Sequence, residues 1–502
     1  MKPKFAFAKS LVTGALLFLA GMLVAPTATA QQQSLLEYPS IHSPRVGLHG
    51  MAVTQSELAS NVGARVLAEG GNAVDAATAI AFTLAVTLPR AGNLGGDGFM
   101  TLYRADTKKV TVIDFRSVAP RAAKLDMFLK SDGKEAPEAS VGYRAPAVPG
   151  TVAGLWLAHQ KYGRTDWKKL VEPARLMAQD GIVLSADEAF VFSWGRKRLS
   201  ASDAALKTFL KADGSLYTAG ERLRQPALAW TLGEIAKGGA DAFYKGEIAR
   251  RFAEDMARHG GLITRDDLTA YRAIEREPLR GTYRGYTLYT PPPASGGATL
   301  LNMLNILENF DVTGSGLGSA ETEHLLAETM RLGHRDRVKH LGDIDFATVP
   351  LKGLLSKEYG AERAKLIDRT KASKNADVKA GDPFAHESPN TTHFSVADRE
   401  GNVVSMTYTL GSDFGSGVMV DGAGFLLNNQ MNNFSHEAAY RAAARGEALP
   451  PNAMQSGKRM MSTMMPTLVF KDEKPWLAVG TPGGGRIINT ILQVVVDRKS
   501  NV

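Results

Sequence analysis

Hydrophobic residues recur at helical spacing through several long stretches of the chain. Residues 56–88 show this spacing on both sides of Gly70 and Gly71, and Asn72, a residue type that caps helices well, follows the break directly. Residues 150–271 show the same period, interrupted by Gly- and Asp-rich segments. The pattern predicts two packed helices in the first stretch and a mostly helical layer over a sheet in the second.

Alternating hydrophobic and polar positions indicate strands elsewhere in the chain. Residues 99–103 and 110–115 alternate in this way and follow a Gly-rich turn at residues 92–98, which predicts a hairpin. Residues 475–480 also suit a strand, and they lead through three consecutive glycines into a helical pattern. This last segment predicts a tight turn from strand to helix.

A second predicted hairpin places two threonines at the start of a strand. Thr391 and Thr392 point to opposite faces of that strand, because successive side chains alternate. A turn centred near Glu400 pairs this strand with residues 403–410 and sets Thr391 opposite Thr409. Two hydroxyl groups are therefore expected to meet at the end of the hairpin.

The segment before this hairpin, residues 373–390, is polar, contains Gly and Pro, and has no periodicity. Such a composition is typical of an exposed linker, where chains are readily cut. If the bond between Asn390 and Thr391 were broken, Thr391 would carry an α-amine beside its hydroxyl. That amine, with a pKa of about 8, could serve as the general base for its own hydroxyl. The alternative interpretation of Thr391 is a structural strand residue.

A hydroxyl nucleophile needs hydrogen-bond donors for the oxyanion that forms in acyl transfer. The glycines at residues 483–485 follow a predicted strand and open a predicted helix, so their backbone N–H groups are candidates for this role. A tight turn that binds no ligand is the alternative.

The N-terminus has the three parts of a secretory signal. Three lysines within the first nine residues are followed by the apolar run LVTGALLFLAGMLV and by an Ala-Thr-Ala site at residues 28–30. This pattern predicts a signal peptide at residues 1–30, a periplasmic or secreted protein, and no stable membrane span after signal removal. An N-terminal membrane anchor is the alternative, because the apolar run approaches the ~20 residues that a spanning helix needs.

The amino-acid composition excludes several kinds of chemistry and partner. The 502 residues are 44% hydrophobic and 22% charged, as in a globular protein of one to three domains. The chain has no cysteine, which excludes disulfides, thiol catalysis and cysteine zinc sites. Its formal charge of +8 is scattered without a basic block, so no nucleic-acid partner is expected. The ten histidines, including His393, show no metal-binding spacing and are assigned core or surface roles, so no metal or other cofactor is expected.

Nine motifs, in order, resemble those of the γ-glutamyltranspeptidase family. They are AGNLGGDGFM, IDFR, PGTVAG, PPPASGG, TTHFSVAD, GNVVSMTYTL, LLNNQMNNF, MSTMMPT and GTPGGGRIINT, and the resemblance spans residues 47–496. It implies an α+β fold, the four-layer αββα sandwich of the N-terminal-nucleophile hydrolases. It also implies a precursor that cuts itself into a large subunit, residues 31–390, and a small subunit, residues 391–502.

The resemblance assigns the catalytic roles. Thr391 would attack the bond to Asn390 in the precursor and afterwards the γ-carbonyl of the acyl donor, and Thr409 would hold it by a hydroxyl hydrogen bond. Gly483 and Gly484 match the backbone donors to the oxyanion. The implied activity is that of a γ-glutamyl transferase or hydrolase acting on glutathione and other γ-glutamyl amides, with water, an amino acid or a peptide as acceptor.

Five further residues match positions that bind the acyl donor in this family. Arg116 would bind the donor's α-carboxylate, for which a guanidinium is well suited. Ser462 and Thr463 match positions that bind the same carboxylate. Gln430 matches a glutamine at the α-amino end, where Asn433 also lies.

Three departures from the family pattern bear on function. Asn433 stands where an aspartate usually pairs with the donor's α-ammonium, and Gly411 stands where an asparagine is usual. A charged hydrogen bond of about 1.5–3 kcal/mol is thereby lost, so a weaker preference for γ-glutamyl groups is expected. The chain also ends earlier than is usual in the family, so that the sandwich is expected to be incomplete at its C-terminal end.

These departures leave two alternatives beside the γ-glutamyl enzyme. A glutaryl amide lacks the α-amine, so Asn433 also fits a glutaryl or cephalosporin acylase that uses the same acyl-threonine chemistry. A truncated, inactive homologue is the second alternative, because missing strands could prevent self-cleavage.

Overall fold

The computed structural model describes residues 45–316, 318–374 and 391–500. The predicted signal peptide, nearly all of the predicted linker and Asn390 therefore lie outside the described residues. The chain divides into a short unit, Met1–Leu48, and a compact unit, His49–Val502, to which all of the following applies.

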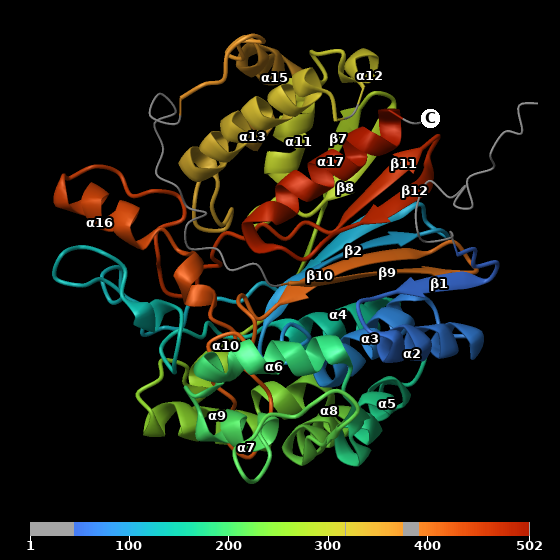
Figure 1. Cartoon of the computed structure of the whole chain (residues 1–502), viewed down its shortest axis with the longest axis vertical. Helices are drawn as coiled ribbons and strands as arrows, with labels where there is room; N and C mark the ends of the chain where they lie inside the picture. The colour runs from blue at the N-terminus through green and yellow to red at the C-terminus, as the bar shows by residue number, and fades with distance from the viewer. Residues whose placement is uncertain (1–44, 317, 375–390, 501–502) are drawn as a thin grey trace, which may run out of the picture. The chain divides into compact units, whose positions relative to one another are not determined.

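Two stacked β-sheets lie between two layers of helices in the compact unit (Figure 1). The larger sheet has, in spatial order, the strands β1 (Gly50–Val53), β9 (Thr392–Asp398), β10 (Val403–Thr409), β2 (Asp97–Arg104), β3 (Lys109–Asp114) and β6 (Ile274–Arg276). The smaller sheet has β12 (Lys474–Val479), β11 (Thr467–Lys471), β8 (Tyr286–Thr290) and β7 (Leu279–Tyr283). This arrangement confirms the predicted four-layer αββα sandwich.

The first helical layer covers the outer face of the larger sheet. It contains α2 (Glu57–Ala68), α3 (Ala73–Thr87), α4 (Thr151–Tyr162), α5 (Trp167–Asp180), α6 (Ala186–Leu199), α7 (Asp203–Phe209), α8 (Pro226–Tyr244), α9 (Glu247–Arg258) and α10 (Arg265–Ala270). Asn72 caps α3 in a capping box with Asp75, so the predicted break between two helices is confirmed. Every residue of α3 is buried, and its apolar side chains form one core with β9 and β10.

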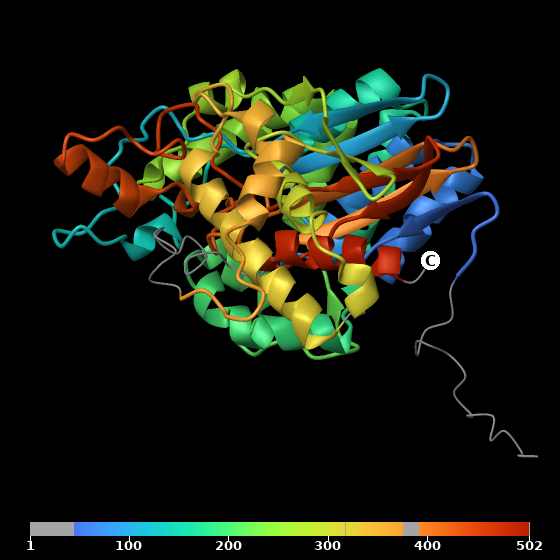
Figure 2. The same cartoon turned by 90° about the horizontal axis from the view of Figure 1, so that it is seen from above.

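The second helical layer covers the smaller sheet. It contains α11 (Gly297–Leu307), α12 (Val312–Ser315), α13 (Ala320–His340), α14 (Leu351–Leu354), α15 (Lys357–Ala364) and α17 (Ile487–Ser500). Figure 2 shows α17, in red, beside the yellow helices of this layer, and their apolar side chains share a second core with β8 and β11. Another helix, α16 (His436–Ala444), lies to one side of the sandwich in Figure 1.

The strand register brings the ends of four neighbouring strands together at one end of the larger sheet. Strands β9 and β10 pair from Val403 with Ala397 to Tyr408 with Thr392, which is the predicted register. On the other side of β10, Asp97 at the start of β2 pairs with Thr409. Because neighbouring strands are antiparallel, the start of β9, the end of β10, the start of β2 and the end of β3 meet there.

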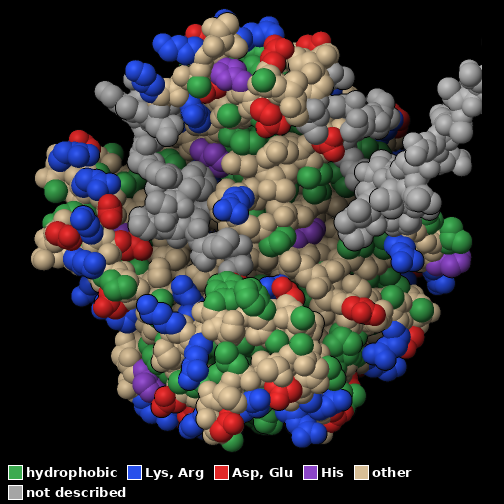
Figure 3. All heavy atoms as spheres, in the orientation of Figure 1, with side chains coloured by type: hydrophobic (Ala, Val, Ile, Leu, Met, Phe, Trp, Pro, Cys, Tyr) green, Lys and Arg blue, Asp and Glu red, His purple; other side chains and the backbone are tan. Residues whose placement is uncertain are grey.

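Surface charge is mixed on the face drawn in Figure 3. Lys and Arg side chains are interspersed with Asp and Glu there and form no continuous groove of one sign.

No helix within the described ranges combines the length and the apolar character that a membrane span requires.

Candidate active site

A small polar pocket lies at the end of the larger sheet where the four strand ends meet. Its lining includes eight residues predicted from the sequence: Arg116, Thr391, Thr409, Gln430, Asn433, Ser462, Thr463 and Gly484. Gly411, Asn432 and Met464 complete the lining, and Gly483 directly precedes Gly484 in the chain. The fold thus brings together residues that are spread over nearly four hundred positions of the sequence.

The two adjacent threonines have separate environments, as predicted. Thr391 directly precedes β9 and lines the pocket, with 6% of its surface exposed. Thr392 is fully buried, and the next residue on its face, Phe394, packs in the core below the sheet. Across the hairpin, the Thr409 hydroxyl accepts a hydrogen bond from the backbone N–H of Gly411 at 2.8 Å. Thr391 is therefore the member of the pair that a ligand in the pocket can reach.

His393 supports the strand that carries Thr391. Its Nδ1 lies 2.9 Å from Thr407 Oγ1 and its Nε2 lies 3.0 Å from Ser395 Oγ. Desolvation lowers the pKa of His393 to about 3, because the charged imidazolium would lose its hydration. A neutral imidazole held by two hydroxyls has a structural role.

The glycine loop after β12 forms one wall of the pocket. Gly483 and Gly484 have φ angles of 132° and 52°, which a glycine adopts without strain, and a short 3₁₀ turn, η4 (Gly484–Arg486), leads into α17. The Thr463 hydroxyl donates to the carbonyl of Gly484 at 2.8 Å and ties the loop to the neighbouring wall. This loop therefore brings Gly484 to the pocket that Thr391 also lines.

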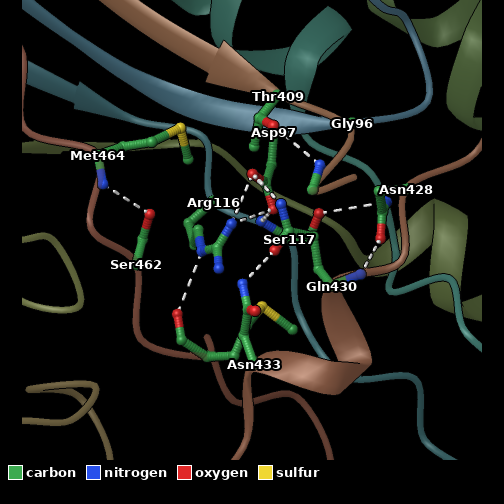
Figure 4. A network of polar contacts seen from close by, with 12 residues as sticks. Gly96, Asp97, Arg116, Ser117, Thr409, Asn428, Gln430, Asn433, Ser462 and Met464 are labelled. Atoms are coloured by element: carbon green, nitrogen blue, oxygen red, sulfur yellow. Dashed lines mark hydrogen bonds and ion pairs between the residues drawn. The ribbon is translucent and has the colours of Figure 1, made fainter. Parts of the chain in front are cut away.

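Arg116 is the one charged side chain among the described residues that line the pocket, and it is ion-paired (Figure 4). Its Nη1 lies 2.7 Å and 2.9 Å from the two carboxylate oxygens of Asp97, and both side chains are completely buried. Its Nε donates to the carbonyl of Met460 and its Nη2 to the carbonyl of Met461, at 3.1 Å and 3.0 Å. The guanidinium is thus held in one orientation at the pocket wall.

Asp97 is a residue of this site that the sequence analysis missed. The observed register of β2 and β3 pairs Phe99 with Asp114, and its extension by two residues sets Asp97 opposite Arg116. The predicted hairpin contained this signal, because the register of a hairpin fixes which residues lie opposite each other.

The far end of the pocket is built from amide side chains. Asn433 Nδ2 donates to Gln430 Oε1 at 2.5 Å, and both residues belong to the 3₁₀ turn η3 (Gln430–Asn433). Gly411 has a φ of 96°, and a Cβ placed on it would lie 2.1 Å from Asn429 Oδ1. A side chain at position 411 would therefore strain the backbone and displace the Asn429 amide, so glycine suits this conformation of the loop.

A buried carboxyl group lies outside the pocket lining. Glu188 on α6 is 7% exposed, and its nearest charged partner is Arg90, whose Nε lies 3.3 Å from Glu188 Oε1. Burial raises the pKa of Glu188 to about 7, since desolvation outweighs the attraction of Arg90, and Asp187 and Asp413 add to the rise.

We expect the Glu188→Gln variant to be more stable than the wild type at pH 8 and equally stable at pH 4.5. A carboxyl with a raised folded-state pKa contributes stability that is complete below its unfolded pKa and is lost as the pH rises through about 7. Glutamine keeps the shape and cannot ionise. Thermal unfolding should show a gain of at least about 2 °C at pH 8. A gain of the same size at both pH values would contradict this, and Glu69→Gln, at an exposed position, is the control.

Within the described ranges, no three or more His, Asp or Glu side chains gather in a way that could hold a metal ion. The pocket instead combines a hydroxyl, a glycine loop and a cationic side chain. These are the components that acyl transfer through a hydroxyl nucleophile uses.

Comparison with known proteins gives concordant matches. The family model described as gamma-glutamyltranspeptidase matches residues 59–499. The glutathione hydrolase proenzyme of Escherichia coli (strain K12) is 44% identical over 453 residues, which are 89% of this chain and 77% of that protein. The crystal structure of cephalosporin acylase from Bacillus halodurans superposes with a TM-score of 0.78 at 27% identity, covering 93% of this chain and 84% of that one. The Helicobacter pylori gamma-glutamyltranspeptidase structure superposes with a TM-score of 0.65 at 38% identity, covering 68% and 97%.

Proposed function

The chain belongs to the gamma-glutamyltranspeptidase family, and from this membership we propose that it is an exported proenzyme that cleaves itself before Thr391 and then transfers or hydrolyses γ-glutamyl groups. The proposed products are a large subunit, residues 31–390, and a small subunit, residues 391–502. One observation carries the proposal: Thr391 begins the hairpin inside a pocket that also holds Arg116 and Gly484.

Self-cleavage would begin at the Thr391 hydroxyl. Its Oγ adds to the carbonyl carbon of Asn390, the bond to the Thr391 nitrogen breaks as that nitrogen takes a proton, and an ester remains. Water hydrolyses the ester, which releases the carboxyl of Asn390 and restores the hydroxyl of Thr391, whose α-amine was freed in the preceding step. The single residue then has both the nucleophile and its general base.

The acyl transfer repeats this chemistry on a donor. The Thr391 α-amine accepts the hydroxyl proton while Oγ attacks the donor's γ-carbonyl, and the N–H groups of Gly483 and Gly484 stabilise the oxyanion. The leaving amine takes this proton from the Thr391 α-ammonium as its bond to the γ-carbonyl carbon breaks, and an acyl-Thr391 ester remains. Water or an amino acid then attacks the ester, so that glutamate or a new γ-glutamyl amide is released and Thr391 is restored.

Glutathione and other γ-glutamyl amides are the proposed donors. The relative from Escherichia coli is named a glutathione hydrolase proenzyme, and the pocket offers groups for both ends of a glutamyl head. Arg116, Ser462 and Thr463 would hold the α-carboxylate. Gln430 and Asn433 would face the α-amino end, and Thr409 would hold the nucleophile.

A glutaryl or cephalosporin acylase is the second candidate. Asn433 is an amide, no carboxylate lines the described pocket, and the superposed Bacillus halodurans structure is a cephalosporin acylase. The two candidates differ in one donor group, the α-ammonium, so side-by-side hydrolysis of γ-glutamyl and glutaryl p-nitroanilides distinguishes them.

We expect the Asn433→Asp variant to increase the preference for γ-glutamyl over glutaryl p-nitroanilide by about tenfold or more. A carboxylate at this position would form a charge-assisted hydrogen bond with the donor's α-ammonium, worth about 1.5–3 kcal/mol. The ratio of kcat/KM for the two donors measures the effect. Asn432→Asp, on the neighbouring residue, tests whether the position of the new carboxylate matters. An equal change of the kcat/KM ratio in both variants would contradict a specific contact of residue 433 with the ammonium.

N-terminal sequencing of the purified protein tests the proposal as a whole. Two sequences are expected, one beginning at Gln31 and one beginning at Thr391. The same sample should release p-nitroaniline from the γ-glutamyl substrate. A single sequence together with no release of p-nitroaniline would overturn the proposed function.

A further inference from the structure

A negative charge lies behind the residues that line the pocket. Asp97 is completely buried behind Arg116 and receives four hydrogen bonds: two from Arg116 Nη1, one from the backbone N–H of Ser117 at 3.0 Å, and one from Gln430 Nε2 at 3.2 Å. Figure 4 shows these groups converging on its carboxylate. A carboxylate with this many donors is held in place on every side.

The ion pair changes what Arg116 can offer a ligand. A guanidinium has five N–H groups. Nη1 faces the two oxygens of Asp97, Nε is taken by Met460 and one N–H of Nη2 by Met461. One N–H remains for a donor's carboxylate, and the positive charge behind it is balanced by Asp97.

Asp97 also fixes the orientation of the amides at the other end of the pocket. An ionised carboxylate only accepts hydrogen bonds, so the Gln430 NH₂ group must point toward Asp97. The Gln430 carbonyl oxygen then faces Asn433 and accepts from its NH₂ group at 2.5 Å. Asn433 is thereby left with its carbonyl oxygen as the acceptor for a ligand, and a carbonyl oxygen suits an ammonium.

We propose that Asp97 determines donor specificity, supplying the negative charge that allows a donor with an ammonium beside its carboxylate to bind in a pocket lined by no carboxylate. This inference rests on the proposed function and names the residue that sets its substrate class. A glutaryl group equals a γ-glutamyl group without the ammonium. Comparison of the two donors therefore isolates the effect of Asp97 on the ammonium.

The test is a charge cycle in the processed enzyme, with the variants Asp97→Asn, Arg116→Gln and the double variant. The readout is the ratio of kcat/KM for γ-glutamyl p-nitroanilide to that for glutaryl p-nitroanilide. Asp97→Asn should lower this ratio at least about tenfold, Arg116→Gln should raise it by a similar factor, and the double variant should stay within about threefold of the wild type. The reason is that Asp97→Asn gives the pocket one more positive charge and Arg116→Gln gives it one fewer. The double variant leaves its net charge unchanged.

Two results would overturn the proposal. One is an unchanged ratio in Asp97→Asn, and the other is a double variant that behaves like Arg116→Gln, since Asp97 would then have no effect of its own. Asp97→Ser repeats the test with a smaller neutral side chain if the asparagine variant does not fold. Asp255→Asn is the matched control, because Asp255 is also completely buried and paired with an arginine, Arg258 at 3.0 Å, on α9 away from the pocket.

A binding measurement separates this inference from the proposed function. Isothermal titration of the same variants with L-glutamate and with glutarate reports the preference for the ammonium without any chemistry. If the wild type hydrolyses neither anilide but the ratio of Kd values follows the charge cycle, the proposed function fails and the role of Asp97 stands. If both anilides are hydrolysed and neither ratio changes in Asp97→Asn, the function stands and the role of Asp97 fails.

Discussion

The Thr391→Ala variant is expected to remain one uncut chain and to lose at least about a thousandfold of the γ-glutamyl anilide hydrolysis. Alanine has no hydroxyl to attack the preceding carbonyl, and the uncut chain has no α-amine at position 391 to act as a base. Both steps of the proposed chemistry therefore stop at once. A denaturing gel measures the cleavage, and release of p-nitroaniline measures the activity.

Thr392→Ala is the matched control for this variant. Thr392 is the adjacent residue of the same type, but it is fully buried and lies outside the pocket lining. We expect the Thr392→Ala chain to be cut at the same bond. Two bands of wild-type size from the Thr391→Ala variant would show that another group performs the cleavage.

The Gly480→Ala variant is expected to leave the precursor largely uncut and to lower hydrolysis at least about a hundredfold. A Cβ at this position would lie 2.1 Å from Nδ1 and 2.4 Å from Cε1 of His393, well inside contact distance. The imidazole is held by two hydroxyls, so the chain after β12 must move instead, and with it Gly483 and Gly484. A displacement of about 1 Å in a catalytic group can cost about a hundredfold in rate.

Gly233→Ala provides the control for this substitution. Gly233 lies within α8, and a methyl group at this position would have Arg175 Cδ as its nearest neighbour at 3.5 Å, an ordinary contact. The control should be cut and active like the wild type and slightly more stable, by about 0.5–1 kcal/mol. Wild-type cleavage and activity in Gly480→Ala would show that the loop tolerates the methyl group.

The sequence predicted the elements whose pattern is local. The capped break at Asn72, the β2–β3 hairpin, the pairing of β9 with β10 and the turn from β12 into α17 each depend on residues close in the chain, and the structure confirms all four. The resemblance of nine motifs added the αββα layering, which depends on contacts between distant segments.

The sequence did not predict the interactions that cross between elements. Asp97 lies within one of the nine motifs, but its importance depends on Arg116, which follows the next strand, and on Gln430 from a distant turn. The reason for glycine at position 411 was also hidden, since it lies in the approach of the Asn429 side chain to the loop backbone. The contact from Gln430 and the approach of Asn429 are consequences of tertiary packing, which hydrophobic periodicity does not encode, whereas the pairing with Arg116 follows from the hairpin register.

The order of strands has a consequence for the two proposed cleavage products. After a cut before Thr391, β9 and β10 of the small product would lie between β1 and β2 of the large one, and β11 of the small product would pair with β8 of the large one. The two chains would thus be interleaved through both sheets rather than joined at a separable surface. Dilution would not dissociate them, and specific activity would be independent of protein concentration.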